Sequence, residues 1–430
     1  MFLEINKIGK FKSAKIEING ITVIAGPNNT GKSTIGKFLF ALFNSFYDIK
    51  LKAKNEKFIF CNEAIKNFII ENMQPIDDYN KFLTLSLHNK FINIEELENL
   101  NQKDFIKKIS EILARYSNAN VDTNAFNIFW NKIENVKNTT IEEYANIILK
   151  RTIDSEFNGQ LINIKHKTAN AKLTLSGIEY SFKFDQYNSY VERVFAGKTD
   201  VTYIDNPYII DNGYDRTISF VDWSNNGIIE ISNHQRNLQN KFYKKYNENN
   251  NPYAIIFQNN KLRKIFDMLT EITQGAFTQY HEKLAFLESR GGKPIYLPNL
   301  STGLKTFVIL KRLIENMVIK EKDLVILDEP EIHLHPEWQL TLAEIIVLLQ
   351  IELNLHVLIN THSPYFLNAI EVFTNKYDNK NRTKYYLSDV DKNESYAKLE
   401  DVTNDVEQIY YLLAKPMQEL NTMTFEEERK

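Results

Sequence analysis

The sequence is short of the features that mark secreted and membrane-embedded proteins. Its 430 residues include one cysteine, Cys61, so no disulfide can form within the chain and a reducing compartment is expected. The N-terminal residues lack the continuous apolar stretch of a signal peptide, and the most apolar segment, residues 343–359, is interrupted by polar side chains. We therefore expect a cytoplasmic protein that reaches a membrane only through a partner.

No charge of one sign dominates either. Lysine and arginine number 52, aspartate and glutamate number 55, and the formal net charge is −3. Any contact with nucleic acid would therefore depend on a local basic patch. With 43% hydrophobic and 25% charged residues, the composition excludes a collagenous, disordered or disulfide-scaffold protein. The length indicates two or three domains, or one domain with a large insertion.

A glycine-rich loop near the N-terminus is the first motif that carries chemistry. Two or three strands are predicted over residues 2–25, the last of them fully apolar, and a helix is predicted over residues 34–46. The segment between them matches the phosphate-binding loop in full, because Gly26, Gly31, Lys32 and Ser33 have the required spacing and context. Its backbone N–H groups would surround a β-phosphate, Lys32 would bridge β- and γ-oxygens, and Ser33 would bind Mg²⁺. The residues predicted to hold ATP here are Gly26, Pro27, Asn28, Asn29, Thr30, Gly31, Lys32, Ser33 and Thr34.

A second motif supplies carboxylates. The apolar strand predicted over residues 324–327 ends in Asp328 and Glu329. Hydrolysis of a Mg²⁺-nucleotide needs two such groups: Asp328 for the hydration shell of the metal and Glu329 to polarise the attacking water. The two motifs together predict an ATPase with Lys32 and Glu329 as catalytic residues.

The regular last third of the chain indicates an α/β core. Strands at 324–327 and 355–359 alternate with helices at 304–318, 336–349 and from 364, which is typical of parallel β-α crossovers. We expect these strands to share one mixed sheet with residues 21–25. The predicted domains are a core of residues 1–47 and 290–400, an insert of residues 48–289 and a C-terminal helix and tail of residues 401–430. The insert is mainly helical, with a β-hairpin at 160–184, a strand at 200–204 and helices within 233–274.

Two further motifs carry a resemblance to a known class. Leu300-Ser301-Thr302-Gly303-Leu304 begins a helix and resembles a degenerate signature motif of ABC-type ATPases, and His362 follows the next strand, where that class has its switch histidine. The resemblance implies an ABC-type P-loop core in which Ser301 and Gly303 form a second anion site. It also implies a head-to-tail homodimer, or a higher even oligomer, in which Ser301 contacts the γ-phosphate held by the other subunit, with His362 as a further catalytic residue.

The residues around Glu329 and His362 resemble a narrower group within this class of ATPases. Glu-Pro-Glu-Ile-His-Leu-His-Pro at 329–336 and Thr-His-Ser-Pro at 361–364 resemble the non-transporter ATPases of the overcoming-lysogenisation-defect and RecF-like branch. The resemblance implies a bacterial ATP-driven switch in anti-phage defence or genome maintenance, acting with a separate effector such as a nuclease or toxin. We interpret Asp389-Val390-Asp391 as a strand-end turn, so this chain is not expected to cut nucleic acid by itself. His333 and His335 are not expected to bind metal, because alternate loop residues do not converge.

Several points stay open in the sequence. Thr302 and Leu304 depart from the transporter signature. The Mg²⁺-sensing glutamine has candidates in Gln186, Gln235 and Gln258, and the strand end at 204–207 is another. Basic segments lie at 107–108, 165–167 and 241–246; we interpret the last as a solvated helix end, with nucleic-acid binding as the alternative.

Three rival functions remain. The first is a DNA-end or structure-binding repair ATPase similar to RecF and structural-maintenance proteins. The second is the ATPase subunit of a transporter, which the large insert argues against. The third is an inactive nucleotide-binding scaffold that holds a toxin silent.

Overall fold

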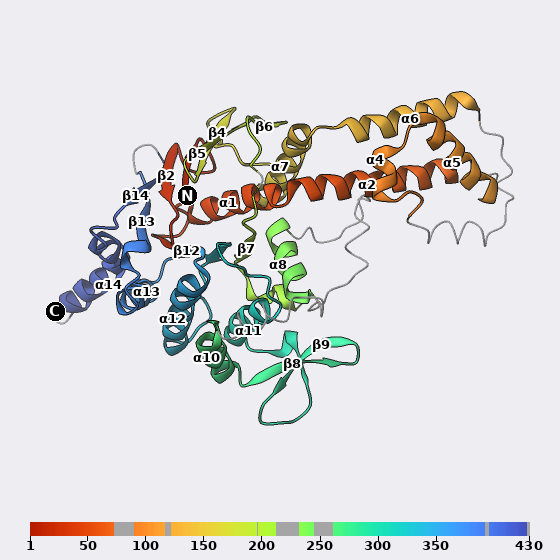
Figure 1. Cartoon of the computed structure of the whole chain (residues 1–430). Helices are drawn as coiled ribbons and strands as arrows, with labels where there is room; N and C mark the ends of the chain where they lie inside the picture. Colours follow the sequence, from red (N-terminus) through yellow and green to blue (C-terminus); the bar gives the residue numbers. More distant parts are fainter. Residues whose placement is uncertain are drawn as a thin grey trace. The chain divides into compact units, whose positions relative to one another are not determined.

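The computed structural model describes residues 1–72, 90–116, 122–195, 197–211, 232–244, 261–391 and 395–427. The chain forms two compact units (Figure 1). The first comprises residues 1–47, 149–193 and 198–430, and the second comprises residues 48–148 and 194–197. The second unit begins at Asp48, where the insert was expected to begin, but most of the expected insert after residue 148 belongs to the first unit.

A six-stranded sheet is the centre of the first unit. Its strand order is β14-β13-β3-β12-β11-β7, and every neighbouring pair except β13 with β14 is parallel. The strands are β3 (Ile21–Ala25), β7 (Val201–Ile204), β11 (Leu324–Asp328), β12 (His356–Thr361), β13 (Thr383–Val390) and β14 (Ala397–Asp401). The predicted sharing of one sheet by the first and last parts of the chain is confirmed. The strand expected in the insert, β7, is instead an edge strand of this sheet.

The two faces of the sheet bury alternate residues. Residues such as Val325 and Leu327 pack in one large apolar cluster with helices on one face. On the other face, Gly36 of α1 (Lys32–Phe46) lies close to Ile326 and Tyr203. Asp328 follows Ile326 by two residues and therefore belongs to the face that α1 covers. The helices of the first face include α8 (Asn233–Tyr243), α10 (Arg263–Thr273), α11 (Thr302–Glu315), α12 (Pro336–Leu353), α13 (Pro364–Lys376) and α14 (Glu407–Glu427).

A second, antiparallel sheet lies in the same unit. Its order is β2-β1-β4-β5-β6, with β1 (Phe2–Asn6), β2 (Ser13–Glu17), β4 (Ala169–Leu175), β5 (Ile178–Phe184) and β6 (Ser189–Val191). The predicted hairpin at 160–184 is confirmed: β4 pairs with β5, and the turn residues Ser176 and Gly177 both have positive φ. A smaller sheet contains β8 (Gly275–Tyr280), β9 (Lys283–Glu288) and β10 (Ile295–Tyr296).

The second unit is helical and has its own apolar core. It contains α2 (Ile49–Glu71), α4 (Ile94–Asn99), α5 (Gln102–Tyr116), α6 (Thr123–Asn138) and the first part of α7 (Ile141–Phe157). In the core, the rings of Phe68 and Phe129 stack at 4.2 Å and Phe105 packs against Trp130. These helices confirm the helical character that was expected in the first part of the insert.

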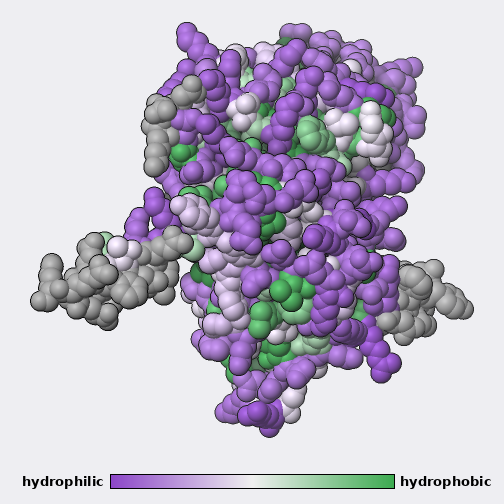
Figure 2. All heavy atoms as spheres, turned by 90° about the vertical axis from the view of Figure 1, so that its left-hand side faces the viewer, coloured by the Kyte–Doolittle hydropathy of each residue, from purple (hydrophilic) through white to green (hydrophobic). Residues whose placement is uncertain are grey.

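The surface of the chain is mainly polar on the side that Figure 2 shows. Hydrophobic side chains appear there as separate small patches among hydrophilic ones. Among the residues that the structure describes, no helix is both long and apolar enough to cross a membrane.

Candidate functional site

The predicted phosphate-binding loop connects β3 to α1, as its sequence context requires. Gly26 has φ 156°, Asn29 has φ 67° and Gly31 has φ 89°. A Cβ atom on Gly26 would lie 1.9 Å from the backbone oxygen of Ser388 on β13, so only glycine fits there. The hydroxyl of Ser388 in turn donates to Thr30 O at 2.9 Å, and β13 thereby supports the loop.

The side chain of Lys32 folds back onto the loop that precedes it. Its ammonium group donates hydrogen bonds to Gly26 O at 2.9 Å and to Pro27 O at 2.8 Å, and the residue is 5% exposed. Burial lowers the pKa of Lys32, and the charges of Glu329 and Asp328 partly offset this effect. The lysine is therefore held beside the two carboxylates predicted for the site.

Asp328 is fixed through both of its oxygens. Tyr203 of β7 donates its hydroxyl to Asp328 Oδ2 at 2.6 Å, and Asn360 of β12 donates its amide to Asp328 Oδ1 at 2.9 Å. Burial and the charge of Asp328 raise the pKa of Tyr203 well above its ordinary value, so this hydroxyl stays a donor. The three residues come from three adjacent parallel strands, which explains why their side chains meet.

Glu329 and His362 lie side by side at the same edge of the sheet. Glu329 follows β11 with φ 50°, and its N–H donates to Asn360 O at 2.9 Å. Glu329 Oε1 lies 3.2 Å from His362 Nδ1, and the two side chains are 26% and 40% exposed. The two predicted catalytic residues are thus adjacent and accessible.

A buried carboxylate behind this pair was not predicted from the sequence. Glu331 is 4% exposed and accepts a hydrogen bond from the hydroxyl of Thr361. The same Thr361 oxygen accepts the N–H of Ser363 at 3.0 Å. Burial raises the pKa of Glu331. This contact connects the segment after Glu329 to the segment that carries His362.

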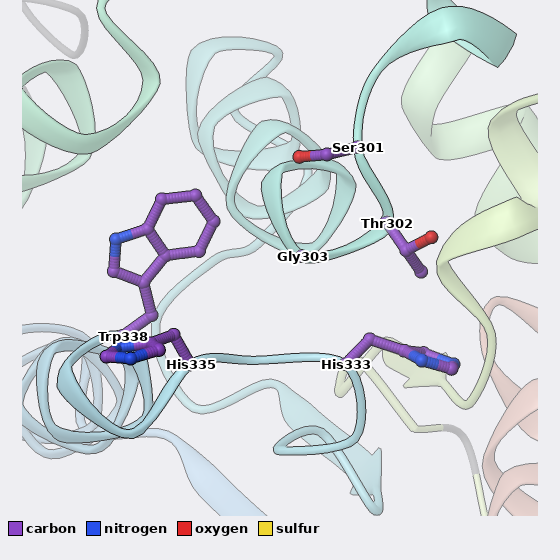
Figure 3. A pocket seen from close by; sticks show the side chains of 6 residues that line it. All are labelled: Ser301, Thr302, Gly303, His333, His335 and Trp338. Carbon is purple, nitrogen blue, oxygen red and sulfur yellow. The ribbon is translucent and has the colours of Figure 1, made fainter.

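The signature-like segment forms a different part of the surface. Ser301, Thr302 and Gly303 at the start of α11 line an open hollow of about 420 Å³, with His333, His335 and Trp338 opposite. In Figure 3 the hydroxyl of Ser301 points to the side where Trp338 lies, and Thr302 points the other way. Thr302 contacts Tyr208 at 2.9 Å, whereas the Ser301 side chain makes no capping hydrogen bond within the described part of the chain.

The strand end at 204–207 lies beside the carboxylate strand, because Ile204 pairs with Leu327. Of the open candidates for the glutamine, Gln186 lies in the exposed turn between β5 and β6, Gln235 lies on α8, and Gln258 is outside the described residues. At the strand end itself, Asp205 accepts a hydrogen bond from His234 at 2.9 Å. The period-two pattern predicted this strand but gave no signal for the histidine.

One basic segment differs from its interpretation as a solvated helix end. Lys241 is buried: its ammonium group donates to Val201 O at 2.7 Å and lies 3.0 Å from Asp200. Phe242 is fully buried. The segment therefore faces the core at Lys241 and Phe242, because an internal carboxylate and a carbonyl satisfy the lysine. Lys244 is exposed, and residues 245 and 246 lie outside the described residues.

The oxygen donors at the sheet edge fit a hard divalent cation. Ser33 lies in the first turn of α1, which packs against β11, and Asp328 ends β11. Hydroxyl and carboxylate oxygens are ligands that Mg²⁺ prefers. Among the described residues, no group of three or more His, Cys, Asp or Glu side chains could hold a metal ion.

Fold and loop together define a P-loop nucleotide-binding ATPase core. The chain belongs to the AAA ATPase domain family, whose model matches residues 1–367. This membership supports nucleotide binding and ATPase activity in general terms.

Three SMC head structures are among the solved structures to which the chain is similar at low identity. The SMC head domain from Thermotoga maritima has 12% identity and a TM-score of 0.38, with 93% of this chain and 98% of that chain covered. An SmcHead bound to the C-winged helix domain of ScpA has 10% identity and a TM-score of 0.43, with 93% and 97% covered. An Smc head with an extended coiled coil bound to the C-terminal domain of ScpA, derived from Pyrococcus furiosus, has 10% identity and a TM-score of 0.39, with 98% of each chain covered.

Proposed function

We propose that this chain is an ATP-hydrolysing switch that forms a head-to-tail dimer when it binds ATP and Mg²⁺ and that controls a separate effector. The observation that carries the proposal is the convergence of Lys32, Asp328, Glu329 and His362 at one edge of the sheet. Their strands β3, β12 and β11 are consecutive and parallel. In open α/β sheets, ligands bind at the carboxyl ends of such strands.

The arrangement supports an in-line attack of water on the γ-phosphate. The loop N–H groups at the start of α1 hold the phosphates, and Lys32 leaves its two carbonyl partners to neutralise their charge. Glu329 orients and polarises the water, and His362, 3.2 Å away, donates to the γ-phosphate. Ser33 and Asp328 would hold Mg²⁺, which would help to neutralise the charge of the phosphates.

The hollow at Ser301 supports the dimer. The start of α11 has N–H groups that the side chain of Ser301 does not cap, and Ser301 itself is exposed; together they suit an anion. Two large apolar side chains are also exposed: Ile332, next to His333 of this hollow, at 39%, and Tyr365, at the start of α13, at 44%. A two-fold interface would bring Ser301 of one subunit to the γ-phosphate held by its partner.

A complementation experiment tests this arrangement. Ser301→Arg and Glu329→Gln are each expected to abolish hydrolysis. In a mixed dimer one of the two sites keeps the loop and Glu329 of the first variant and the Ser301 of the second. Mixing equal amounts before adding ATP should therefore restore about a quarter of the wild-type rate, since half of randomly formed dimers are mixed.

The control is Ser289→Arg, which places the same charge on an exposed serine outside the hollow and should leave the rate unchanged. Light scattering should give a dimer of Glu329→Gln with ATP and a monomer without it. A mixture that stays inactive, together with a monomer at saturating ATP, contradicts the dimer while leaving ATP hydrolysis by one subunit open.

The biological setting rests on the resemblance of residues 329–336 and 361–364 to the overcoming-lysogenisation-defect and RecF-like branch. We place the protein in the bacterial cytoplasm, in defence against phage, with an effector encoded nearby. Affinity capture from a native host should recover one partner whose amount changes between ATP and ADP. Equal recovery with both nucleotides contradicts a nucleotide-controlled effector.

A DNA-binding repair ATPase is the second candidate, and one surface feature favours it. Lys165 and Lys12 lie over the ring of Tyr396, with Nζ 4.5 Å and 5.7 Å from its centre, and Lys167 is exposed beside them. Cations next to an aromatic ring suit phosphate and base contacts. Binding of a short DNA duplex that weakens with salt and is lost in Lys165→Glu/Lys167→Glu would support this function.

A further inference from the structure

A buried cluster behind Asp328 has no part in the mechanism so far. His234, at the start of α8, is 2% exposed. Its Nδ1 lies 2.6 Å from Glu156 Oε2, and its Nε2 lies 2.9 Å from Asp205 Oδ2. The backbone N–H of His234 also donates to Glu156 Oε1 at 2.8 Å. One imidazole therefore joins the end of α7, the end of β7 and the start of α8.

The cluster packs directly against Tyr203. The rings of His234 and Tyr203 have centres 4.6 Å apart at an angle of 31°, and Phe40 of α1 contacts both rings. Tyr203 is fully buried. Its ring has little freedom to move, and its hydroxyl is directed at Asp328 Oδ2 at 2.6 Å.

The charges in the cluster are balanced for a buried position. Burial lowers the pKa of His234, but the hydrogen bonds to Asp205 and Glu156 outweigh this effect and raise its pKa to about 9. An imidazolium between two carboxylates gives each of the three groups an oppositely charged partner, whereas a single buried charge would be costly. Such a paired cluster restricts the movement of its members.

A hydrogen-bond partner that is held rigidly helps a carboxylate to bind a metal ion. A carboxylate that can rotate loses conformational freedom when a cation binds, and hydrogen bonds made in advance reduce this cost. Asp328 has two such bonds, from Tyr203 and Asn360. The bond from Tyr203 is in turn supported by the charged cluster, which packs against the tyrosine ring.

We propose that Tyr203, held in place by the cluster of Glu156, His234 and Asp205, is a positioning residue that sets the orientation of the Asp328 carboxylate for Mg²⁺. The inference rests on the proposed function, in which Asp328 binds the cation. Neither Tyr203 nor His234 touches the nucleotide in this scheme. Both act through the geometry of Asp328.

Removal of one hydroxyl tests the proposal. Tyr203→Phe keeps the ring and its packing but deletes the hydrogen bond to Asp328. Binding of a fluorescent ATP analogue is titrated with Mg²⁺ and, separately, measured in EDTA. We expect the Mg²⁺ concentration for half-maximal binding to rise about 10- to 100-fold, with binding in EDTA unchanged. Tyr243→Phe, which removes the bond from a partly buried tyrosine to Ile210 O, is the matched control and should behave as wild type.

A second variant tests the role of the cluster without altering Tyr203. His234→Gln should raise the Mg²⁺ requirement by less than Tyr203→Phe does. If His234 acts through Tyr203, the double variant should match Tyr203→Phe alone, because coupled residues are not additive. Thermal unfolding of each variant identifies those that are folded, and His234→Gln carries the test should Tyr203→Phe not fold.

The outcomes separate this inference from the proposed function. A wild-type Mg²⁺ requirement in folded Tyr203→Phe or in folded His234→Gln overturns the positioning role while the ATPase proposal stands. A wild type whose ATP binding and hydrolysis ignore Mg²⁺ overturns both. Weaker ATP binding in EDTA for Tyr203→Phe also overturns the inference, because it would show a general effect on the nucleotide pocket.

Discussion

Glu329 Oε1 lies 3.2 Å from His362 Nδ1 at the carboxyl ends of two adjacent parallel strands. The strands set this distance, because Asp328 pairs with Asn360 in register and each catalytic candidate directly follows its strand. The carboxylate and the imidazole therefore do not need a conformational change to meet. This arrangement can hold a water molecule on one side and a phosphate oxygen on the other.

Glu329→Gln should separate binding from hydrolysis. The amide has the size of the carboxylate but cannot accept a proton, so the hydrolysis rate should fall about 100-fold or more. ATP binding should be kept, because Lys32 and the loop are unchanged. Phosphate release and equilibrium binding measure the two quantities.

The exposed Glu400 on β14 provides the control for this test, since Glu400→Gln should retain the wild-type rate. Equal rates for Glu329→Gln and wild type would remove Glu329 from the mechanism. If that shared rate is close to zero, the inactive scaffold becomes the better description.

Thr361→Val should slow hydrolysis without weakening ATP binding. The valine keeps the shape of the threonine but loses the hydroxyl that contacts Glu331 and accepts the N–H of Ser363. The segment that carries His362 then loses its anchor, and we expect kcat to fall about 10- to 100-fold. Thr361→Ser, which keeps the hydroxyl, should restore most of the rate. A serine variant as slow as the valine variant would contradict this role.

Gly26→Ala should lower the free energy of unfolding far more than Gly159→Ala does, although both glycines have positive φ. The new Cβ would meet the backbone oxygen of Ser388 at 1.9 Å, so the loop or β13 must shift, at a cost of about 3 kcal/mol. Gly159 has φ 74° and no atom within 4 Å of such a Cβ, so Gly159→Ala should lose only about 1 kcal/mol. Urea unfolding compares the two, and similar losses would be at odds with the close contact.

The stability of the protein should fall as the pH rises from about 6.5 to 9. The pKa of His234 is about 9 in the folded protein and about 6.5 when unfolded. A raised folded pKa gives stability that is complete below the lower value and is lost as the pH passes the upper one. The folding equilibrium constant should therefore decrease at least about tenfold more across this window in wild type than in His234→Gln.

The titration of a second buried group, Asp323, does not interfere with this measurement. Burial raises the pKa of Asp323 to about 6, so its charge changes below the window and does so in both proteins. Chemical unfolding at several pH values measures the difference. Parallel curves for wild type and His234→Gln would show that His234 is not the group that titrates.

The sequence predicted those parts of the site that depend on short segments. The loop at 26–33 carries its own φ requirements in its glycines, and the apolar run before Asp328 specifies a buried strand. The strand 355–359, which leads to His362, was recognised for the same reason. Their common edge followed from the parallel crossovers.

What the sequence could not predict depends on pairings across long distances. β7 has four residues, and nothing local shows that it joins β11, 120 residues later, rather than the hairpin close to it. The contact of Tyr203 with Asp328 and the cluster of Glu156, His234 and Asp205 follow from that pairing. Lys241 was misjudged for the same reason, since its partner Asp200 precedes this strand.

The support of the loop by β13 has a consequence during synthesis. The N-terminal loop leaves the ribosome first, but the strand that pairs with β3 and supplies the carbonyl opposite Gly26 lies more than 350 residues later. A nascent chain therefore holds an unbraced loop until β13 has also been made. The ability to capture nucleotide thus depends on a strand that is synthesised long after the loop itself.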